Sequence, residues 1–295
     1  MDYLSNHQQR VIIPGTGSSS SSRPINIGVF QGSCLGPLLF NIAALNMSSY
    51  IPDEVNGLPV QIVRYADDTQ VAVSGPSSRL ADIQAGTEQV LDILSTYFMQ
   101  NGMCVNPTKT ELLLVGSKQR LNTIQHPPSV QFMGAVLRPS NEVKNLGVIM
   151  DCHLSYEAHI NSVVNKCSGM LIGLMHARHV LPRDILPVLV NSLVLSHVRY
   201  CCAVYGNGAT DTALQRLQKV INFAARVVSG RRKFDHVSDV VKDLGWLSVK
   251  QQITHSTLML THSVLKANEP ESIRDSFRFN RDAVTRETRQ TDHLR

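Results

Sequence analysis

Residues 60–73 read Val60-Gln61-Ile62-Val63-Arg64-Tyr65-Ala66-Asp67-Asp68-Thr69-Gln70-Val71-Ala72-Val73. Two runs rich in β-branched residues flank a pair of adjacent carboxylates, and this pattern predicts a β-hairpin with acid at its tip. Aspartate is depleted in strands and neighbouring carboxylates repel each other, so Asp67 and Asp68 carry a local cost in folding free energy. A divalent cation would remove that cost, because Mg²⁺ prefers carboxylate oxygens and substrate phosphates. An Asp-rich surface turn explains the same residues equally well, and this stretch alone leaves both interpretations open.

A second motif lies upstream, where residues 28–40 read Gly28-Val29-Phe30-Gln31-Gly32-Ser33-Cys34-Leu35-Gly36-Pro37-Leu38-Leu39-Phe40. Gly32 permits close approach of a ligand to the backbone, and Ser33 is placed to cap a helix whose apolar run begins at Leu35. By itself, this segment is explained as well by an ordinary loop that enters a buried helix. A Gln-Gly-Ser-x-Leu-Gly-Pro block followed by Tyr-Ala-Asp-Asp in a hairpin is a specific combination. It resembles the reverse transcriptase domain of non-LTR retrotransposons, in both order and spacing.

The periodicity of the chain predicts an α+β part followed by an all-helical part, with a boundary near residue 155. We expect helices over residues 35–50, 79–100, from about 156, 183–200, 211–229 and 248–266, and β segments over 60–74, 111–115 and 142–150. The resemblance implies a partial polymerase palm, an antiparallel sheet with helices, in residues 1–155. It implies a helical thumb and post-thumb region in 156–266, and residues 267–295 form a charged, flexible tail in this interpretation.

The resemblance also assigns site residues. Asp67 is expected to be the main Mg²⁺ ligand and Asp68 a weaker one, with Tyr65 near the primer terminus. The template base or incoming nucleotide is expected at Gln31, Gly32 and Ser33. The turn at Leu146 and Gly147, within a block that resembles the hairpin gripping the primer end, is expected to position the primer.

Lys109 lies in Asn106-Pro107-Thr108-Lys109-Thr110, which resembles the next block of the family. The resemblance places this lysine near the phosphates of the incoming nucleotide, where it would stabilise or protonate the departing pyrophosphate. A solvated turn lysine remains the alternative.

Reverse transcriptases hold two metal ions with three aspartates, one of them on a strand upstream of the Gln-Gly-Ser block. Residues 3–10 resemble the segment just after that strand, and Asp2 lacks an apolar-strand context. Phe30 stands where the family usually has proline. We therefore expect a truncated polymerase that lacks the fingers and the first aspartate, has an unpaired sheet edge, and shows no measurable polymerase activity alone.

Composition agrees with this interpretation without deciding it. The chain has 295 residues, 43% of them hydrophobic, with a net charge of +5 and a pI of 8.9, which suits a polyanionic partner or an ordinary enzyme. Six scattered cysteines without a CxxC pair favour buried thiols over a disulfide framework or zinc site. Residues 1–7 lack the features of a signal peptide, and no apolar run approaches the ~20 residues of a membrane span. We expect a soluble intracellular protein, cytoplasmic or nuclear, without a membrane partner; its oligomeric state is open.

The expected partners, by resemblance, are an RNA template, a DNA primer and deoxynucleoside triphosphates. The cations Arg226, Arg231, Arg232 and Lys233 follow an amphipathic segment and could neutralise phosphates. A solvated helix end, whose cations suit the C-terminal dipole, explains them as well.

Three hypotheses follow from these features. The first is a truncated reverse transcriptase, the second a nucleic-acid-binding remnant without chemistry, and the third another palm enzyme such as a nucleotide cyclase or RNA-templated RNA polymerase. Strong salt-dependent but metal-independent duplex binding would favour the second. The Gln-Gly-Ser block argues against the third, and we adopt the first.

Overall fold

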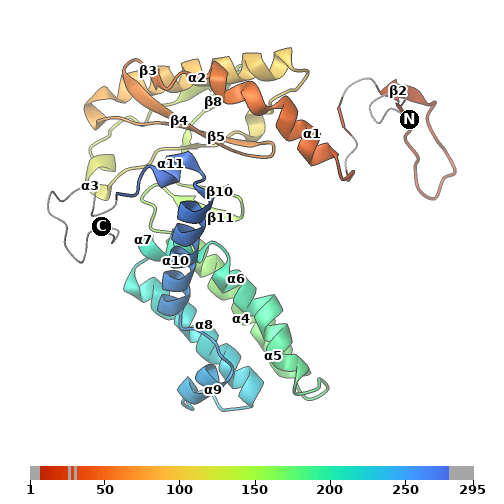
Figure 1. The fold of residues 1–295 in the computed structure, drawn as a ribbon, viewed down its shortest axis with the longest axis vertical. Helices are drawn as coiled ribbons and strands as arrows, with labels where there is room; N and C mark the ends of the chain where they lie inside the picture. Colours follow the sequence, from red (N-terminus) through yellow and green to blue (C-terminus); the bar gives the residue numbers. More distant parts are fainter. Residues whose placement is uncertain (1–6, 26–27, 30–31, 279–295) are drawn as a thin grey trace. The chain divides into compact units, whose positions relative to one another are not determined.

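The computed structural model describes residues 7–25, 28–29 and 32–278. It divides into two compact units, Met1–Ser140 and Asn141–Arg295. The first combines small sheets with one long helix, and the second is a hairpin followed by helices (Figure 1), so the mixed α+β composition is confirmed. The division lies upstream of the expected boundary near residue 155, because the hairpin over residues 142–151 packs on the first long helix of the helical unit.

The N-terminal unit is built around an antiparallel sheet in the order β3-β4-β5. Strands β1 and β2 pair antiparallel, as do β7 and β8, whereas β6 and β9 pair parallel. The elements in chain order are β1 (His7–Gln9), β2 (Arg23–Ile25), α1 (Gly36–Ala43), the 3₁₀ helix η1 (Leu45–Tyr50), β3 (Glu54–Val55), β4 (Leu58–Tyr65), β5 (Asp68–Val73), η2 (Ser77–Arg79), α2 (Leu80–Gln100), η3 (Pro107–Lys109), β6 (Leu112–Leu113), α3 (Lys118–Leu121), β7 (Val130–Phe132), β8 (Ala135–Leu137) and β9 (Pro139–Ser140).

Helix α2 covers one face of the sheet, and the core of this unit lies between them (Figure 1). Alternate residues of β4 and β5 point into this core, as a strand buried on one face requires. The buried residues are Met47, Ile51, Val55, Val90, Leu94 and Tyr97. The expected hairpin over 60–74 and the helix over 79–100 are therefore confirmed. The expected helix over 35–50 is interrupted at Ala44, which separates α1 from η1.

The C-terminal unit begins with an antiparallel hairpin and continues with helices. Its elements are β10 (Glu142–Asn145), β11 (Val148–Asp151), α4 (Glu157–Ala177), α5 (Ile185–Val190), the π-helical segment η4 (Asn191–Leu195), α6 (Ser196–Arg199), α7 (Cys202–Gly208), α8 (Asp211–Ser229), α9 (Ser238–Asp243), α10 (Val249–Ala267) and α11 (Glu271–Arg274). The four helical segments expected downstream of residue 155 are confirmed, whereas the short helices α7, α9 and α11 were not expected; α11 lies in the segment predicted as a flexible tail.

Local capping explains where two of these helices begin. The Thr210 hydroxyl accepts a hydrogen bond from the Ala213 N–H at the start of α8. Ser248 and Gln251 form a reciprocal capping box at the start of α10. These side chains satisfy backbone N–H groups that have no partner inside the helix.

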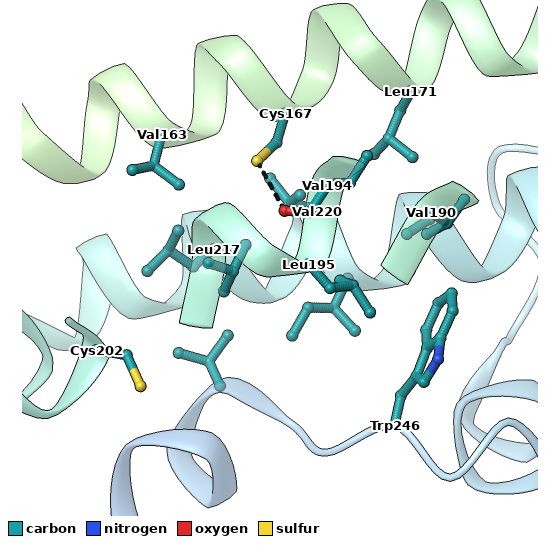
Figure 2. Packing of buried hydrophobic residues seen from close by; sticks show 14 of the residues in the cluster. Val163, Cys167, Leu171, Val190, Val194, Leu195, Cys202, Leu217, Val220 and Trp246 are labelled. Carbon is teal, nitrogen blue, oxygen red and sulfur yellow. Dashed lines mark hydrogen bonds between the residues drawn. The ribbon is translucent and has the colours of Figure 1, made fainter. Parts of the chain in front are cut away.

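The core of the C-terminal unit lies between α4, η4 and α8 (Figure 2). Cys167 and Leu171 are fully buried on α4, and the Cys167 thiol donates to the Val194 carbonyl at 3.5 Å. Burial raises the pKa of the Cys167 thiol to about 11. The adjacent residues Val194 and Leu195 of η4 are both buried in this core. Trp246 closes one end of this cluster.

All six cysteines are free thiols. Among the residues that the structure describes, none of the helices is by itself long and apolar enough to cross a membrane.

Candidate functional site

The acid-tipped hairpin expected from the sequence is confirmed. Strands β4 and β5 pair with Tyr65 opposite Asp68, which leaves Ala66 and Asp67 as a two-residue turn. Ala66 adopts the left-handed conformation with φ of 53°, which a non-glycine residue adopts at a cost. Asp67 therefore lies in the turn itself and Asp68 begins the next strand. Both carboxylates are exposed.

The two faces of the hairpin differ in character. Ile62 and Arg64 face inward, whereas Val63 and Tyr65 face outward and are 63% and 67% exposed. Directly opposite residues of an antiparallel pair share a face, so Asp68 and Tyr65 lie on the same outer face of the hairpin. Among the strands that the structure describes, β5 pairs only with β4 and forms the edge of the sheet. This outer face can receive a ligand next to the two carboxylates.

The inward side chain of Arg64 connects this hairpin to α1. Its guanidinium donates to the Ala44 carbonyl at 2.5 Å, and the Tyr97 hydroxyl of α2 donates to the Ala43 carbonyl at 3.3 Å. These bonds satisfy carbonyl groups at the end of α1, where the helix itself supplies no partner. Sequence analysis missed both residues. The sequence signal that could have indicated Arg64 is an arginine at a position where the alternation of the strand places side chains inward.

The Gln-Gly-Ser block is described in part, since Gln31 and Phe30 lie outside the described residues. Gly32 has φ of +83°, a conformation that favours glycine. The Ser33 hydroxyl accepts a hydrogen bond from the N–H of Gly36, the first residue of α1, at 3.0 Å. Ser33 therefore binds the first N–H of α1, but the N-cap position itself is Leu35, without a side-chain cap, so the expected capping role of Ser33 is met only in part. Contact of this block with a nucleotide stays a prediction.

Lys109 is the last residue of η3 and is exposed. Asn106 organises this turn, because its side-chain oxygen accepts from the Thr108 N–H at 3.0 Å and its carbonyl from the Lys109 N–H at 3.1 Å. In the described part of the chain, no ion pair joins Lys109 to Asp67 or Asp68. The role of Lys109 toward a phosphate therefore stays a prediction.

The turn between β10 and β11 belongs to the C-terminal unit and also has two residues, Leu146 and Gly147. Their φ values are 44° and 84°, both left-handed. The Tyr200 hydroxyl, at the junction of α6 and α7, donates to the Leu146 carbonyl at 2.6 Å. A Cβ atom on Gly147 would lie 3.6 Å from the Tyr200 ring. Tyr200 thus supports the turn by a hydrogen bond and by contact, a role that no local sequence signal indicates.

The hairpin offers only part of a metal site. Carboxylate oxygens are the ligands that Mg²⁺ prefers, and Asp67 and Asp68 supply them side by side. Within the described residues, no three His, Cys, Asp or Glu side chains lie together as a metal-binding group. Since the resemblance implies three aspartates, these residues do not complete a two-metal site.

Sequence similarity to known proteins identifies the family of this chain. Residues 1–150 match the family described as reverse transcriptase (RNA-dependent DNA polymerase). The chain belongs to the reverse transcriptase family. The match includes the Gln-Gly-Ser block, the acidic hairpin and the Leu146–Gly147 turn.

Curated relatives of this reverse transcriptase chain come from mobile elements of flies. It is 29% identical over 244 residues to an RNA-directed DNA polymerase from mobile element jockey of Drosophila funebris, a match that covers 79% of this chain and 25% of the relative. The jockey protein of Drosophila melanogaster is 27% identical over 232 residues, covering 77% of this chain and 24% of the relative. A probable RNA-directed DNA polymerase from transposon X-element of the same species is 24% identical over 242 residues, covering 81% and 26%.

The chain spans about a quarter of the length of these curated relatives. No solved structure matches it.

Proposed function

We propose that this chain forms the acidic-hairpin part of the palm and the thumb of an RNA-directed DNA polymerase from a non-LTR retrotransposon. The observation that carries this proposal is the tight β4–β5 hairpin, which exposes Asp67 in its turn and Asp68 opposite Tyr65 in the strand register. The left-handed Ala66 is what a two-residue hairpin turn requires, so the proposal depends on the paired acids and the exposed tyrosine at this turn. We assign residues 1–155 to the palm, 156–266 to the thumb and post-thumb region, and 267–295 to a charged tail.

In this proposal Asp67 is the principal Mg²⁺ ligand and Asp68 the second. Both residues are exposed, so an ion and a nucleotide can reach the carboxylates from solvent. Tyr65 supplies a flat apolar surface for the terminal nucleotide of the primer. The described edge of β5 leaves backbone groups available for one further strand, which is how a third carboxylate would reach the site.

The remaining assignments follow the same proposal. Gln31, Gly32 and Ser33 contact the template base or incoming nucleotide, and Lys109 contacts its phosphates. Leu146 and Gly147 position the primer, with Tyr200 holding their turn. The substrates are an RNA template, a DNA primer and deoxynucleoside triphosphates, with Mg²⁺ as the metal.

Formation of a ternary complex tests this proposal. A labelled DNA primer with a dideoxy end is annealed to an RNA template, and its affinity for the chain is measured by fluorescence anisotropy. We expect the matching nucleotide to tighten binding in Mg²⁺ but not in EDTA, and Asp67→Asn to abolish that gain. Glu54→Gln is the matched control, because Glu54 is an exposed carboxylate of the same sheet and should leave the gain intact.

A second candidate is a nucleic-acid-binding remnant without chemistry, favoured by the presence of only two candidate metal ligands at the hairpin. It predicts duplex binding that depends on salt but neither on Mg²⁺ nor on nucleotide, and such a result would replace the first proposal. We also expect no primer extension by the 295-residue chain alone. Template-dependent extension that Asp67→Ala abolishes would contradict this expectation.

A further inference from the structure

A loop of residues 230–237 joins α8 to α9 (Figure 1), and it contains Phe234. The Phe234 side chain is 87% exposed, the largest exposed fraction among the large apolar side chains of the described chain. The Lys233 ammonium lies 5.5 Å from the centre of this ring. Because the ring is so exposed, a flat surface remains open to a ligand.

Hydrogen bonds fix the shape of this loop. The Asp235 N–H donates to the Arg232 carbonyl at 3.2 Å, which makes Lys233 and Phe234 the central residues of a tight turn. The Asp235 carboxylate in turn accepts from the Arg232 N–H at 2.7 Å. Arg226 of α8 donates two hydrogen bonds to the Asp235 carbonyl, at 3.2 and 3.1 Å. The aromatic ring is therefore carried by a structured turn.

Arg231 anchors the other side of the loop. Its guanidinium donates to the His236 carbonyl at 2.5 Å and forms a two-pronged ion pair with the Asp239 carboxylate, at 2.6 and 2.5 Å. The sequence suggested four equivalent cations for binding phosphates. The structure separates them, since Arg226 and Arg231 hold the loop together, whereas Arg232 and Lys233 are exposed beside Phe234.

We propose that the turn formed by Arg232, Lys233 and Phe234 binds single-stranded nucleic acid, with an unpaired base stacked on the Phe234 ring and the two cations near its phosphates. Bases stack on exposed aromatic rings without regard to sequence, and flanking cations add an electrostatic contribution. Arg226 of α8 and the loop cations Arg231, Arg232 and Lys233 outnumber the neighbouring acids Asp235, Asp239 and Asp243, so the local charge suits a polyanion. A membrane surface is less well matched, because one ring on a turn offers no extended apolar face.

This inference takes only its class of partner from the proposed function. The loop lies in the C-terminal unit, and binding there needs neither Mg²⁺ nor the carboxylates of the hairpin. Failure of one proposal is therefore visible separately from failure of the other.

The test is the affinity of the full chain for a labelled single-stranded pyrimidine 12-mer, as RNA and as DNA, measured by anisotropy without Mg²⁺. We expect Phe234→Ala to raise Kd about tenfold, the effect of losing one stacked base. Phe234→Trp should retain tight binding because it keeps the aromatic surface. Val180→Ala is the matched control, since Val180 is 84% exposed in the same unit.

A charge series gives a second readout. Arg232→Gln and Lys233→Gln should each lower the slope of log K against log salt by ~0.7, one phosphate contact on a single strand. Lys250→Gln should leave the slope unchanged, because the Lys250 ammonium pairs with Asp211 at 2.9 Å.

An unchanged Kd in Phe234→Ala would overturn the inference. Loss of tight single-strand binding in a folded Phe234→Trp would overturn it as well. The inference would also be overturned, in favour of a lipid surface, if anionic phospholipid vesicles captured the chain through Phe234 while single-strand binding did not depend on Phe234. Phe234→Ala should leave intact the gain in primer–template affinity that the matching nucleotide causes at the hairpin, whereas Asp67→Asn should leave single-strand binding intact.

Discussion

Tyr200 is a positioning residue for the proposed primer-contacting turn. Its hydroxyl donates to the Leu146 carbonyl, and its ring lies against Gly147, so one side chain fixes a turn whose two residues are both left-handed. The hydroxyl itself is not required for the fold of the core, because Tyr200 is 51% exposed.

The first prediction concerns this hydroxyl. Tyr200→Phe should raise the Kd for primer–template roughly two- to tenfold, because loss of one hydrogen bond leaves the turn less well held. Stability should fall by no more than ~1 kcal/mol. Tyr50→Phe, at a tyrosine that is 57% exposed in the other unit, is the control. Equal affinities for Tyr200→Phe and wild type would show that the turn does not depend on this bond.

The second prediction is a pH dependence that arises from His159. Its Nδ1 accepts from the Ile149 N–H at 3.4 Å, its ring lies 5.0 Å from that of Tyr205, and Nε2 has no partner among the described residues. Burial lowers the pKa of His159. The unfolded chain therefore takes up a proton first, at about 6.5, so the free energy of unfolding falls as the pH drops below that value.

Urea unfolding at pH 7.5 and 5.5 measures this effect. The difference between the two pH values should be smaller in His159→Gln, whose side chain does not titrate, than in the wild type. If both proteins lose the same free energy on acidification, another group controls the pH dependence.

At the scale of elements, the β4–β5 hairpin carries backbone strain at Ala66, with φ of 53°. The third prediction is that Ala66→Gly raises the free energy of unfolding by up to ~1 kcal/mol, because glycine adopts this conformation without a Cβ clash. Ala72→Gly, at an exposed position inside β5, should instead destabilise by about 0.5–1 kcal/mol. Denaturant unfolding of both variants decides between strain at the turn and a general glycine effect.

Elements with strong periodicity were predictable from the sequence, and those fixed by distant contacts were not. Alternation over residues 60–73 and helical spacing over 80–100 located β4, β5 and α2. At the break at Ala44, Arg64 and Tyr97 from other elements donate to the Ala44 and Ala43 carbonyls, and no local pattern carries that information. The candidate site was likewise predictable only in part. Its acidic turn follows from the sequence, whereas the Tyr200 contact needs the tertiary structure.

For the whole molecule, the main question is where the helical unit begins. The family match ends at residue 150, yet the β10–β11 hairpin lies in the compact unit that starts at Asn141. Val148 of this hairpin is 6% exposed within the helical core. Partial burial raises the pKa of Asp151, but its hydrogen bonds from the N–H groups of Ser155, His153 and Tyr156 outweigh this and lower it. The hairpin therefore contributes to the entry into α4.

The fourth prediction compares two shortened chains, residues 141–295 and residues 156–295. The first keeps the whole of its core cluster and should unfold cooperatively, as followed by circular dichroism at 222 nm. The second loses Val148, the Ile149 N–H that binds His159 and the Asp151 carboxylate that holds the Tyr156 N–H at 2.6 Å. Its free energy of unfolding should be lower by roughly 2–4 kcal/mol. Equal stability of the two chains would place the start of the folded unit near residue 155, as the sequence pattern suggested.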